Sequence, residues 1–140
     1  MTNVTEEFAD VGTLLRTEYP KEPVYCIFPH VYQKTAKEFL EGFPGRVLYA
    51  VKANPDPTIL GLLVDAGVCH FDCASLAEIE LVESIDPDTT KYFMNPARIR
   101  GAAGTAQEKY GVRHFVVDHL SGLIQLANEI DISLAVIVVT

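Results

Sequence analysis

Short apolar runs alternate with amphipathic stretches along most of this chain. The runs begin near Val47, Val68, Lys91, His114 and Leu134, spaced by roughly 20 to 23 residues. Each gap holds a stretch whose apolar residues recur at helical spacing. Regular alternation of strand and helix is typical of βα units around a parallel sheet, so the sequence predicts an α/β fold.

Local signals give the expected bounds of the elements. The last predicted strand, 134–139, is wholly apolar, as expected of a strand that is buried on both faces. Upstream of the repeat, the pattern predicts a helix over 5–17, a strand over 24–28 and a helix over 30–40. Within the repeat, the predicted strands are 47–51, 68–74, 91–94, 114–117 and 134–139, and the predicted helices are 57–66, 76–85, 95–111 and 120–130.

Helix caps support several of these predictions. Asp56 can cap a helix that has Pro57 in its first turn and stops at Gly67. The segment from Ser75 to Glu78 has the S-x-x-E form of a capping box, in which the two side chains satisfy free backbone amides. Asn95-Pro96 and Asp118 are the expected caps of the next two helices.

The pattern alone leaves two architectures open, a doubly wound sheet and a barrel. No glycine-rich phosphate loop follows the first strand of the repeat to favour the doubly wound sheet. A complete eight-unit barrel needs about 250 residues. We therefore expect this chain to be part of a barrel if it belongs to that architecture.

Composition narrows the class of protein. The 140 residues are 49% hydrophobic and 21% charged, with a net charge of −8 and no basic cluster, which argues against a nucleic-acid partner. No apolar segment reaches the ~20 residues of a membrane span, and the N-terminus lacks a secretory signal, so we expect a cytoplasmic protein. The three cysteines form no C-x-x-C pair; we expect buried thiols and no metal site.

Lys52 is the strongest candidate for chemistry because it directly follows an apolar strand, where parallel α/β folds place their active sites. Burial there would lower the pKa of its amine and make it a nucleophile able to form an imine. The alternative is an ordinary surface lysine at a strand end.

Four motifs, in order, resemble the pyridoxal-phosphate-dependent ornithine and diaminopimelate decarboxylases, whose barrel is shared with alanine racemase. The F-D-C-A-S wording of the second motif is closer to the ornithine-type members. The motifs are Y-A-V-K-A-N-P-D-P at 49–57, H-F-D-C-A-S at 70–75 with E-I-E-L-V at 78–82, N-P-A-R at 95–98, and G-V-R at 111–113 leading to F-V-V-D at 115–118.

This resemblance implies the N-terminal portion of a pyridoxal-phosphate-binding (β/α)8 barrel, with Lys52 holding the cofactor as a Schiff base. It also implies that Asp72 and Glu78 line the cofactor side of the pocket. Each has a structural alternative, since Asp72 can support the strand end and Glu78 fits the capping box. Arg98 stands where the family usually has lysine and is expected at a solvated helix start. His70, His114 and His119 are expected to be structural.

The resemblance further implies a homodimeric decarboxylase of a basic amino acid: ornithine, lysine, arginine or diaminopimelate. Residues 1–28 would accompany a separate β domain, and residues 29–140 would form the partial barrel that carries the lysine. Because the family's later cofactor contacts are absent, and the fifth strand has no arginine, we expect a truncated chain that is inactive alone. The competing hypothesis is a non-catalytic barrel homologue that acts as a binding or regulatory protein; an alanine-racemase-like barrel is disfavoured by F-D-C-A-S.

Overall fold

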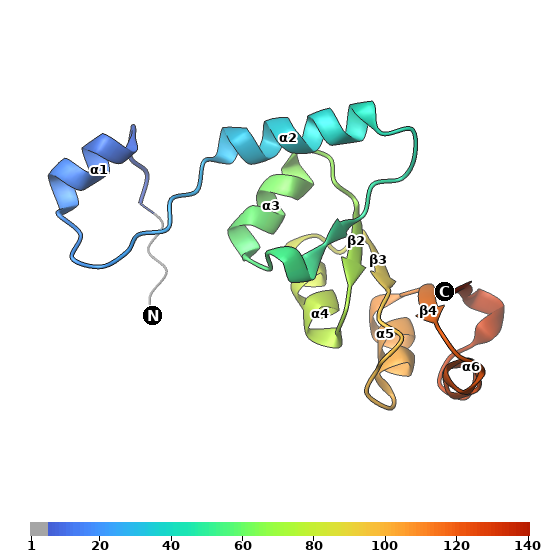
Figure 1. Cartoon of the computed structure of the whole chain (residues 1–140). Helices are drawn as coiled ribbons and strands as arrows, with labels where there is room; N and C mark the ends of the chain where they lie inside the picture. The colour runs from blue at the N-terminus through green and yellow to red at the C-terminus, as the bar shows by residue number, and fades with distance from the viewer. Residues whose placement is uncertain (1–5) are drawn as a thin grey trace.

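A computed structural model describes residues 6–140 of the chain, with five parallel strands in one sheet. Figure 1 shows these strands with their helices. The strands are β1 (Tyr49–Ala50), β2 (His70–Cys73), β3 (Thr90–Phe93), β4 (His114–Val117) and β5 (Val136–Val139). The helices are α1 (Val11–Glu18), α2 (Pro29–Gly42), α3 (Pro57–Asp65), α4 (Leu76–Ile85), α5 (Ala102–Tyr110) and α6 (Leu120–Ala127), with 3-10 turns η1 (Val51–Ala53) and η2 (Ile132–Leu134).

The strand order in space follows the order in sequence, β1-β2-β3-β4-β5. A doubly wound sheet reverses its strand order at a switch point, whereas a barrel adds each new strand beside the previous one. The predicted α/β fold is therefore confirmed, and the order favours the barrel over the doubly wound alternative.

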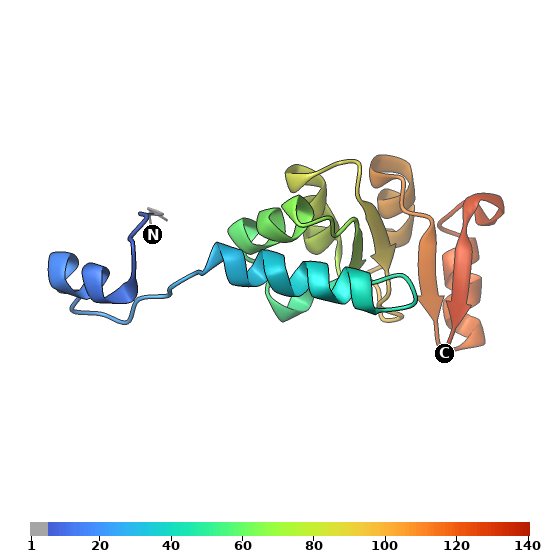
Figure 2. The same cartoon turned by 90° about the horizontal axis from the view of Figure 1, so that it is seen from above.

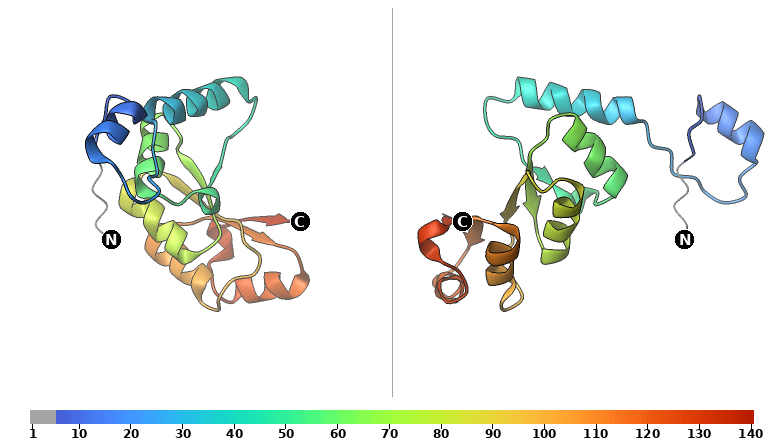
Figure 3. Two further views of the ribbon diagram at one scale, coloured as in Figure 1. Left: turned by 60° about the vertical axis from the view of Figure 1, so that its left-hand side comes forward. Right: turned by 180° about the vertical axis from the view of Figure 1, so that it is seen from behind.

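The two faces of the sheet have different environments. Helices α3 to α6 follow one another along one face, as the left view of Figure 3 shows, and the strand residues on that face form the core with them. Phe71, Phe93 and Phe115, one from each central strand, are the largest fully buried side chains. Aromatic rings of this kind bury ~150 to 250 Å² each, so they dominate the packing of sheet against helices.

Lys91 is the exception on the helix-covered face, where it lies 4% exposed beside apolar residues. Its ammonium forms an ion pair with Glu83 of α4 and donates a hydrogen bond of 3.1 Å to the carbonyl oxygen of Pro87. A buried charge is tolerated only when it is paired and hydrogen-bonded, and both conditions are met here.

The N-terminal segment differs most from its prediction. Helix α1 begins at Val11, where Asp10 caps it, and not near Thr5, which lies outside the described residues. Residues 24–28, predicted as a strand of a separate β domain, form no strand within residues 6–140, where no partner strand lies beside them, so the prediction of that domain stays untested. In Figures 1 and 2 this segment joins α1, which stands apart, to α2 beside the sheet. Extended backbone without a partner strand cannot form a ladder.

The caps predicted from sequence are correct for α3 and α4. The Asp56 carboxylate accepts hydrogen bonds from the backbone amides of Thr58 and Ile59, at 2.8 and 3.3 Å, and Pro57 opens α3. Ser75 caps α4 by accepting from the Glu78 amide at 3.3 Å. These signals are local, so they can be recognised without the tertiary structure.

Helix α5 corrects the prediction that Asn95-Pro96 begins a helix. The helix starts only at Ala102, after Gly101 with φ 79°, and it ends at Tyr110, with Gly111, the predicted end, as its C-cap. The Asn95 side chain instead donates to the carbonyl oxygen of Ala74 at 3.1 Å and accepts from the Ala97 amide at 3.1 Å. These bonds fix the segment as a loop after β3 and tie it to the carboxyl end of β2.

Helix α6 begins at Leu120 as predicted, but its N-cap is His119, one residue after the predicted cap Asp118. The His119 imidazole, and not Asp118, accepts from the Ser121 amide at 3.2 Å, and the helix ends at Ala127 rather than at 130. Imidazole nitrogen can replace a carboxylate oxygen here because only an acceptor is needed at a helix N-terminus.

The two outer strands also depart from prediction. Strand β1 keeps only two residues because the chain turns into η1 at Val51. Strand β5 is not buried on both faces: Val136, Val138 and Val139 are exposed, at 53%, 39% and 72%. Val136 and Val138 lie on the uncovered inner face, whereas Val139 lies on the other face, beside Val117, at the end of this edge strand.

The cysteines are not all buried. Cys73 lies in the core, where burial raises the pKa of its thiol to about 12, so it stays protonated. Cys26 and Cys69 are exposed, against the expectation of three buried thiols.

The close contact between α5 and the segment after α6 gives a test of this packing. A Cβ added at Gly104 would lie 2.7 Å from the backbone carbonyl oxygen of Glu129, which cannot move without shifting the chain. We predict that Gly104→Ala lowers the free energy of unfolding by about 1 to 3 kcal/mol, as overpacking usually does. Urea denaturation followed by circular dichroism measures this change.

Gly61→Ala is the matched control, since a Cβ at this helical position meets nothing within 4 Å. It should raise stability by about 0.5 to 1 kcal/mol, because alanine loses less backbone entropy than glycine in a helix. Equal effects of the two substitutions would contradict the close packing of α5.

Candidate cofactor site

The residues singled out by sequence lie at the carboxyl ends of β1 and β2. Lys52 is in η1, directly after β1, and Asp72 is the third residue of β2. Glu78 is in the first turn of α4, which follows β2. The fold therefore gathers Lys52, Asp72 and Glu78 at one edge of the sheet, where parallel α/β proteins form their binding sites.

Local bonds hold the turn that presents Lys52. Val51 is fully buried and anchors η1 in the core. The Tyr49 hydroxyl donates to the Asn54 carbonyl oxygen at 3.2 Å, and the Asn54 side chain accepts from the Asp56 amide at 3.1 Å. Lys52 itself is exposed, which corrects the expectation that it would be buried, and within residues 6–140 its ammonium forms neither a hydrogen bond nor an ion pair. A rigid turn thus presents an amine with open access.

Asp72 lies on the face of the sheet opposite the helices. Its strand neighbours Phe71 and Cys73 are fully buried under the helices, and side chains alternate along a strand, so Asp72 points to the uncovered inner face. Partial burial raises the pKa of its carboxyl group, while the positive charge of Lys52 acts in the opposite direction. Lys52 and Asp72 are therefore electrostatic neighbours.

Glu78 makes the reciprocal half of a cap, shifted by one residue from the usual form. Its carboxylate accepts a hydrogen bond of 2.8 Å from the Ala74 amide rather than from the amide of Ser75. The negative charge also sits at the N-terminus of α4, where the helix dipole favours it. The structure thus gives Glu78 a clear structural role, and its charge contributes to raising the pKa of Asp72.

Asn95 belongs to this edge, although the sequence pattern placed it only as a helix cap. Through its bond to the Ala74 carbonyl oxygen it ties the loop after β3 to the loop between Asp72 and Glu78. A side-chain amide after a strand is too common a feature to reveal such a role without the structure.

Arg98 is not at a solvated helix start, as expected from the sequence. Its guanidinium is half-buried and donates to the carbonyl oxygens of Asn95 and Val116, at 2.8 and 2.7 Å, with the ring of Phe93 5.7 Å away. Burial lowers the pKa of this group. Arg98 therefore braces β3 against β4.

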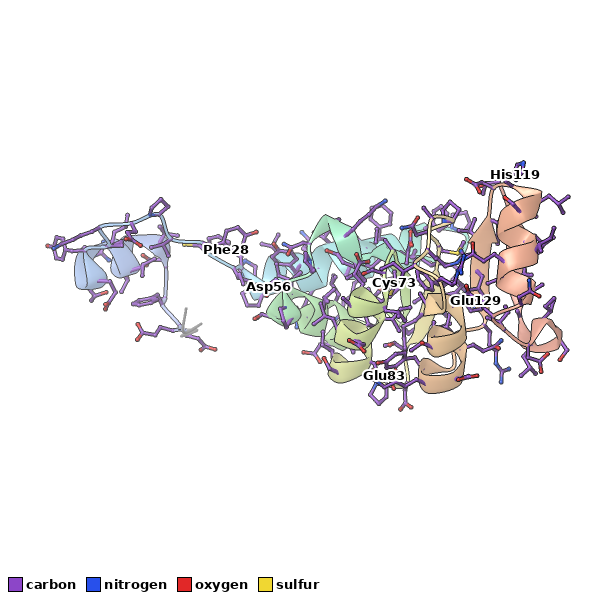
Figure 4. The ribbon with its side chains drawn as sticks, turned by 90° about the horizontal axis from the view of Figure 1, so that it is seen from below. Phe28, Asp56, Cys73, Glu83, His119 and Glu129 are labelled. Carbon is purple, nitrogen blue, oxygen red and sulfur yellow. The ribbon has the colours of Figure 1, made fainter. Side chains whose placement is uncertain are left out.

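Of His70, His114 and His119, only His119 follows the carboxyl end of a strand. His119 caps α6, and Figure 4 shows it at the end of that helix. His70 and His114 are the first residues of β2 and β4, at the opposite ends of their strands from Lys52. In the part of the chain that the structure describes, no three His, Cys, Asp or Glu side chains are placed to hold a metal ion. Nor does any helix there have the length and apolar character to cross a membrane.

Known proteins with similar sequences are amino-acid decarboxylases and related proteins. A lysine/ornithine decarboxylase of Selenomonas ruminantium is 38% identical over 86 residues, which is 60% of this chain and 21% of that protein. The human protein named antizyme inhibitor 2 is 38% identical over 78 residues, 54% of this chain and 16% of that protein. This chain therefore spans only about a fifth of these relatives.

The fold is shared with solved decarboxylase structures. The crystal structure of the Paramecium bursaria Chlorella virus arginine decarboxylase superposes with a TM-score of 0.80 and 25% identity, covering 92% of this chain and 34% of that chain. Together with the sequential parallel sheet, this similarity confirms the prediction of a partial (β/α)8 barrel.

Residues 30–139 match the family described as "Pyridoxal-dependent decarboxylase, pyridoxal binding domain", whose cofactor is pyridoxal phosphate. The matched region begins in α2 and ends in β5, so it includes Lys52, Asp72 and Glu78 with the strands that position them. Because the match covers well over half of its length, this chain belongs to the pyridoxal-dependent decarboxylase family.

Proposed function

We propose that this chain is the lysine-bearing part of a pyridoxal-phosphate-dependent decarboxylase that acts on a basic amino acid. The observation that carries the proposal is Lys52, an exposed amine that follows the first barrel strand and has Asp72 as its electrostatic neighbour. The names of similar proteins, with lysine, ornithine and arginine as substrates, support the substrate class.

The chemistry of the residues present fits this cofactor. An aldehyde condenses with a primary amine, and the amine of Lys52 is exposed and forms no ion pair among residues 6–140. When bound, the cofactor supplies an electron sink for the electron pair left by departing carbon dioxide. We propose that Lys52 holds the cofactor, and that its Nζ can carry a proton to or from the reacting carbon once the substrate amine has displaced it.

We propose different roles for Asp72 and Glu78 in the same site. Asp72 faces the inner side of the sheet, and we propose that it lines the cofactor pocket with a carboxylate. Glu78 is already held by the Ala74 amide, so we propose that it acts on the pocket through its charge and by fixing the turn after β2. Both roles keep negative charge near the amino group of a bound amino acid.

The substrate is best identified by direct competition among basic amino acids. The full-length protein, loaded with pyridoxal phosphate, is incubated with carboxyl-labelled ornithine, lysine, arginine and diaminopimelate, and released carbon dioxide is counted. Release from one or more of these substrates supports the proposal. No release from any of them, with cofactor bound, would exclude a basic amino-acid decarboxylase.

A second candidate is a non-catalytic member of the same family. It is favoured by the human relative named antizyme inhibitor 2 and by the fifth strand, where V-I-V-V carries no charged side chain toward the site. This candidate predicts no absorbance from a cofactor imine, no carbon dioxide release, and unchanged partner binding after Lys52→Ala. The labelled-substrate assay separates it from the enzyme.

We also propose the assembly and organisation expected from family resemblance: a cytoplasmic homodimer, with 1–28 accompanying a separate β domain and 29–140 carrying the cofactor lysine. Residues 19–28, between α1 and α2, form neither helix nor strand, and the proposed boundary lies at the end of this segment. Sedimentation of the full-length protein tests the dimer.

Removal of the Lys52 amine gives the most direct test of the site. We predict that borohydride reduction of the cofactor-loaded full-length protein leaves a pyridoxyl adduct on Lys52, detected by peptide mass spectrometry. Lys52→Arg should abolish the adduct and lower kcat by at least about 10²-fold, since covalent catalysis through an amine is lost.

Lys37→Arg is the matched control, because Lys37 is an exposed lysine on α2. It should leave both the adduct and the rate unchanged. An adduct on another lysine, or one that persists in Lys52→Arg, contradicts the assignment of Lys52.

Asp72→Asn separates a functional carboxylate from a merely structural one. The folded-state pKa of Asp72 is raised mainly by burial, so its ionised form costs stability as pH rises through that pKa. We predict a higher Tm for Asp72→Asn at pH 7.5 and no gain at pH 3, where both states hold the proton. Cofactor affinity should fall by about tenfold, the value of one charge-assisted hydrogen bond.

The control is Asp65→Asn, which neutralises an exposed carboxylate of α3. It should change neither the pH dependence of Tm nor cofactor affinity. If Asp72→Asn raises Tm at pH 7.5 and leaves affinity intact, Asp72 only supports the strand end.

A further inference from the structure

The inner face of the sheet carries a second polar cluster, toward the amino ends of the strands. It consists of Arg46, just before β1, with His70 of β2, Tyr92 of β3 and His114 of β4. His70 precedes Asp72 by two residues, about 6.6 Å along β2, while Tyr92 is the register partner of Asp72 on the neighbouring strand. The mechanism proposed above uses none of these four side chains.

Tyr92 holds the cluster together. Its hydroxyl accepts a hydrogen bond of 3.1 Å from Arg46 Nη1 and lies 3.4 Å from His70 Nδ1. Its ring stacks on the imidazole of His114, with centroids 4.2 Å apart and planes tilted by 32°. The edge of the His70 ring meets the same tyrosine at 5.8 Å. Tyr92 is 6% exposed, so it is a rigid centre for three nitrogen-bearing side chains.

The cluster contains donors and potential cations but no acid. Among residues 6–140, Arg46 forms no ion pair, although the chain has 19 acidic residues and a net charge of −8. Burial and then the charge of Arg46 lower the pKa values of His70 and His114, and no carboxylate opposes either shift. His114 Nδ1 is buried without a hydrogen-bond partner. Asp72, the register partner of Tyr92, forms no hydrogen bond or ion pair with these groups among residues 6–140, so the nitrogen donors of the cluster have no carboxylate in contact.

We propose that Arg46, His70 and His114 bind an oxyanion on the inner face of the sheet, with Tyr92 positioning the three groups. The guanidinium supplies parallel N–H donors that match two oxygens of a carboxylate, phosphate or sulfate. The two imidazoles add donors when they take up protons, so binding strengthens as pH falls. The oxyanion is either a free ion or a carboxylate side chain of the same protein from outside these 140 residues.

The test follows His70 and His114 in the full-length protein by NMR of histidines labelled at Cε1. The pKa values of both are measured in chloride and then in sulfate at equal ionic strength, because the charge of sulfate does not change over pH 5 to 9. Arg46→Gln is measured in parallel, and the exposed Arg16 of α1, replaced by Gln, is the control for loss of a positive charge elsewhere.

The sign of the Arg46→Gln effect decides the proposal. If a free oxyanion binds, sulfate raises both histidine pKa values and raises Tm, and Arg46→Gln abolishes both effects. If a carboxylate of the same protein occupies the cluster, sulfate has no effect, and Arg46→Gln lowers Tm because the carboxylate loses its guanidinium partner. Arg16→Gln should alter neither response.

With no oxyanion present, Arg46 only repels protons from the two imidazoles. Arg46→Gln would then raise both histidine pKa values without lowering Tm, and sulfate would change neither quantity. That result overturns the proposal. It leaves the role of Lys52 untouched, since neither readout depends on the cofactor or on catalysis.

Discussion

The burial of each strand under its own helix is the constraint on which the rest of this structure depends. A parallel strand cannot return by a hairpin, so the chain crosses back through a helix before the next strand is added. Phe71, Phe93 and Phe115 fill the layer between strands and helices, one for each central unit. Because every unit runs in the same direction, all carboxyl ends reach the same edge, and side chains far apart in sequence meet there.

At that edge, the side chains that accept hydrogen bonds from free backbone amides also hold the turns that present the candidate cofactor residues. Asn54 and Asp56 close the turn that exposes Lys52, while Ser75 and Glu78 close the turn after Asp72. Asn95 then links the next loop to the second turn. The free amides of helix N-termini need acceptors in any βα fold, and here those acceptors also set the position and electrostatics of the proposed cofactor site.

The inner face has a different character from the helix-covered face. It carries Asp72, His70, Tyr92 and His114, and it continues to the exposed valines of β5. Polar groups at this depth raise or lower one another's pKa values because water screens them less than at a surface. The inner face is thus the side on which binding can be controlled by charge, and the helix-covered face is the side that stabilises the fold.

The sequence by itself determined what local chemistry can specify. The spacing of apolar runs, the caps at Asp56 and Ser75, and the motif around Lys52 predict the α/β fold, helices α3 and α4, and the family. The two caps each lie within one turn, and the spacing of apolar runs can be read along the chain without knowledge of any tertiary contact.

Only the tertiary structure decided the features that depend on a distant partner. Residues 24–28 have the composition of a strand but no neighbour to pair with, and β5 is apolar yet exposed because it forms an edge. Asn95 forms a loop instead of starting a helix because Ala74, 21 residues earlier, accepts its side-chain hydrogen bond. Arg46 and Tyr92 are 46 residues apart in sequence, and they form their hydrogen bond only because the fold brings them together. Pairing energies of this kind arise when strands come together, so no pattern along the chain can contain them.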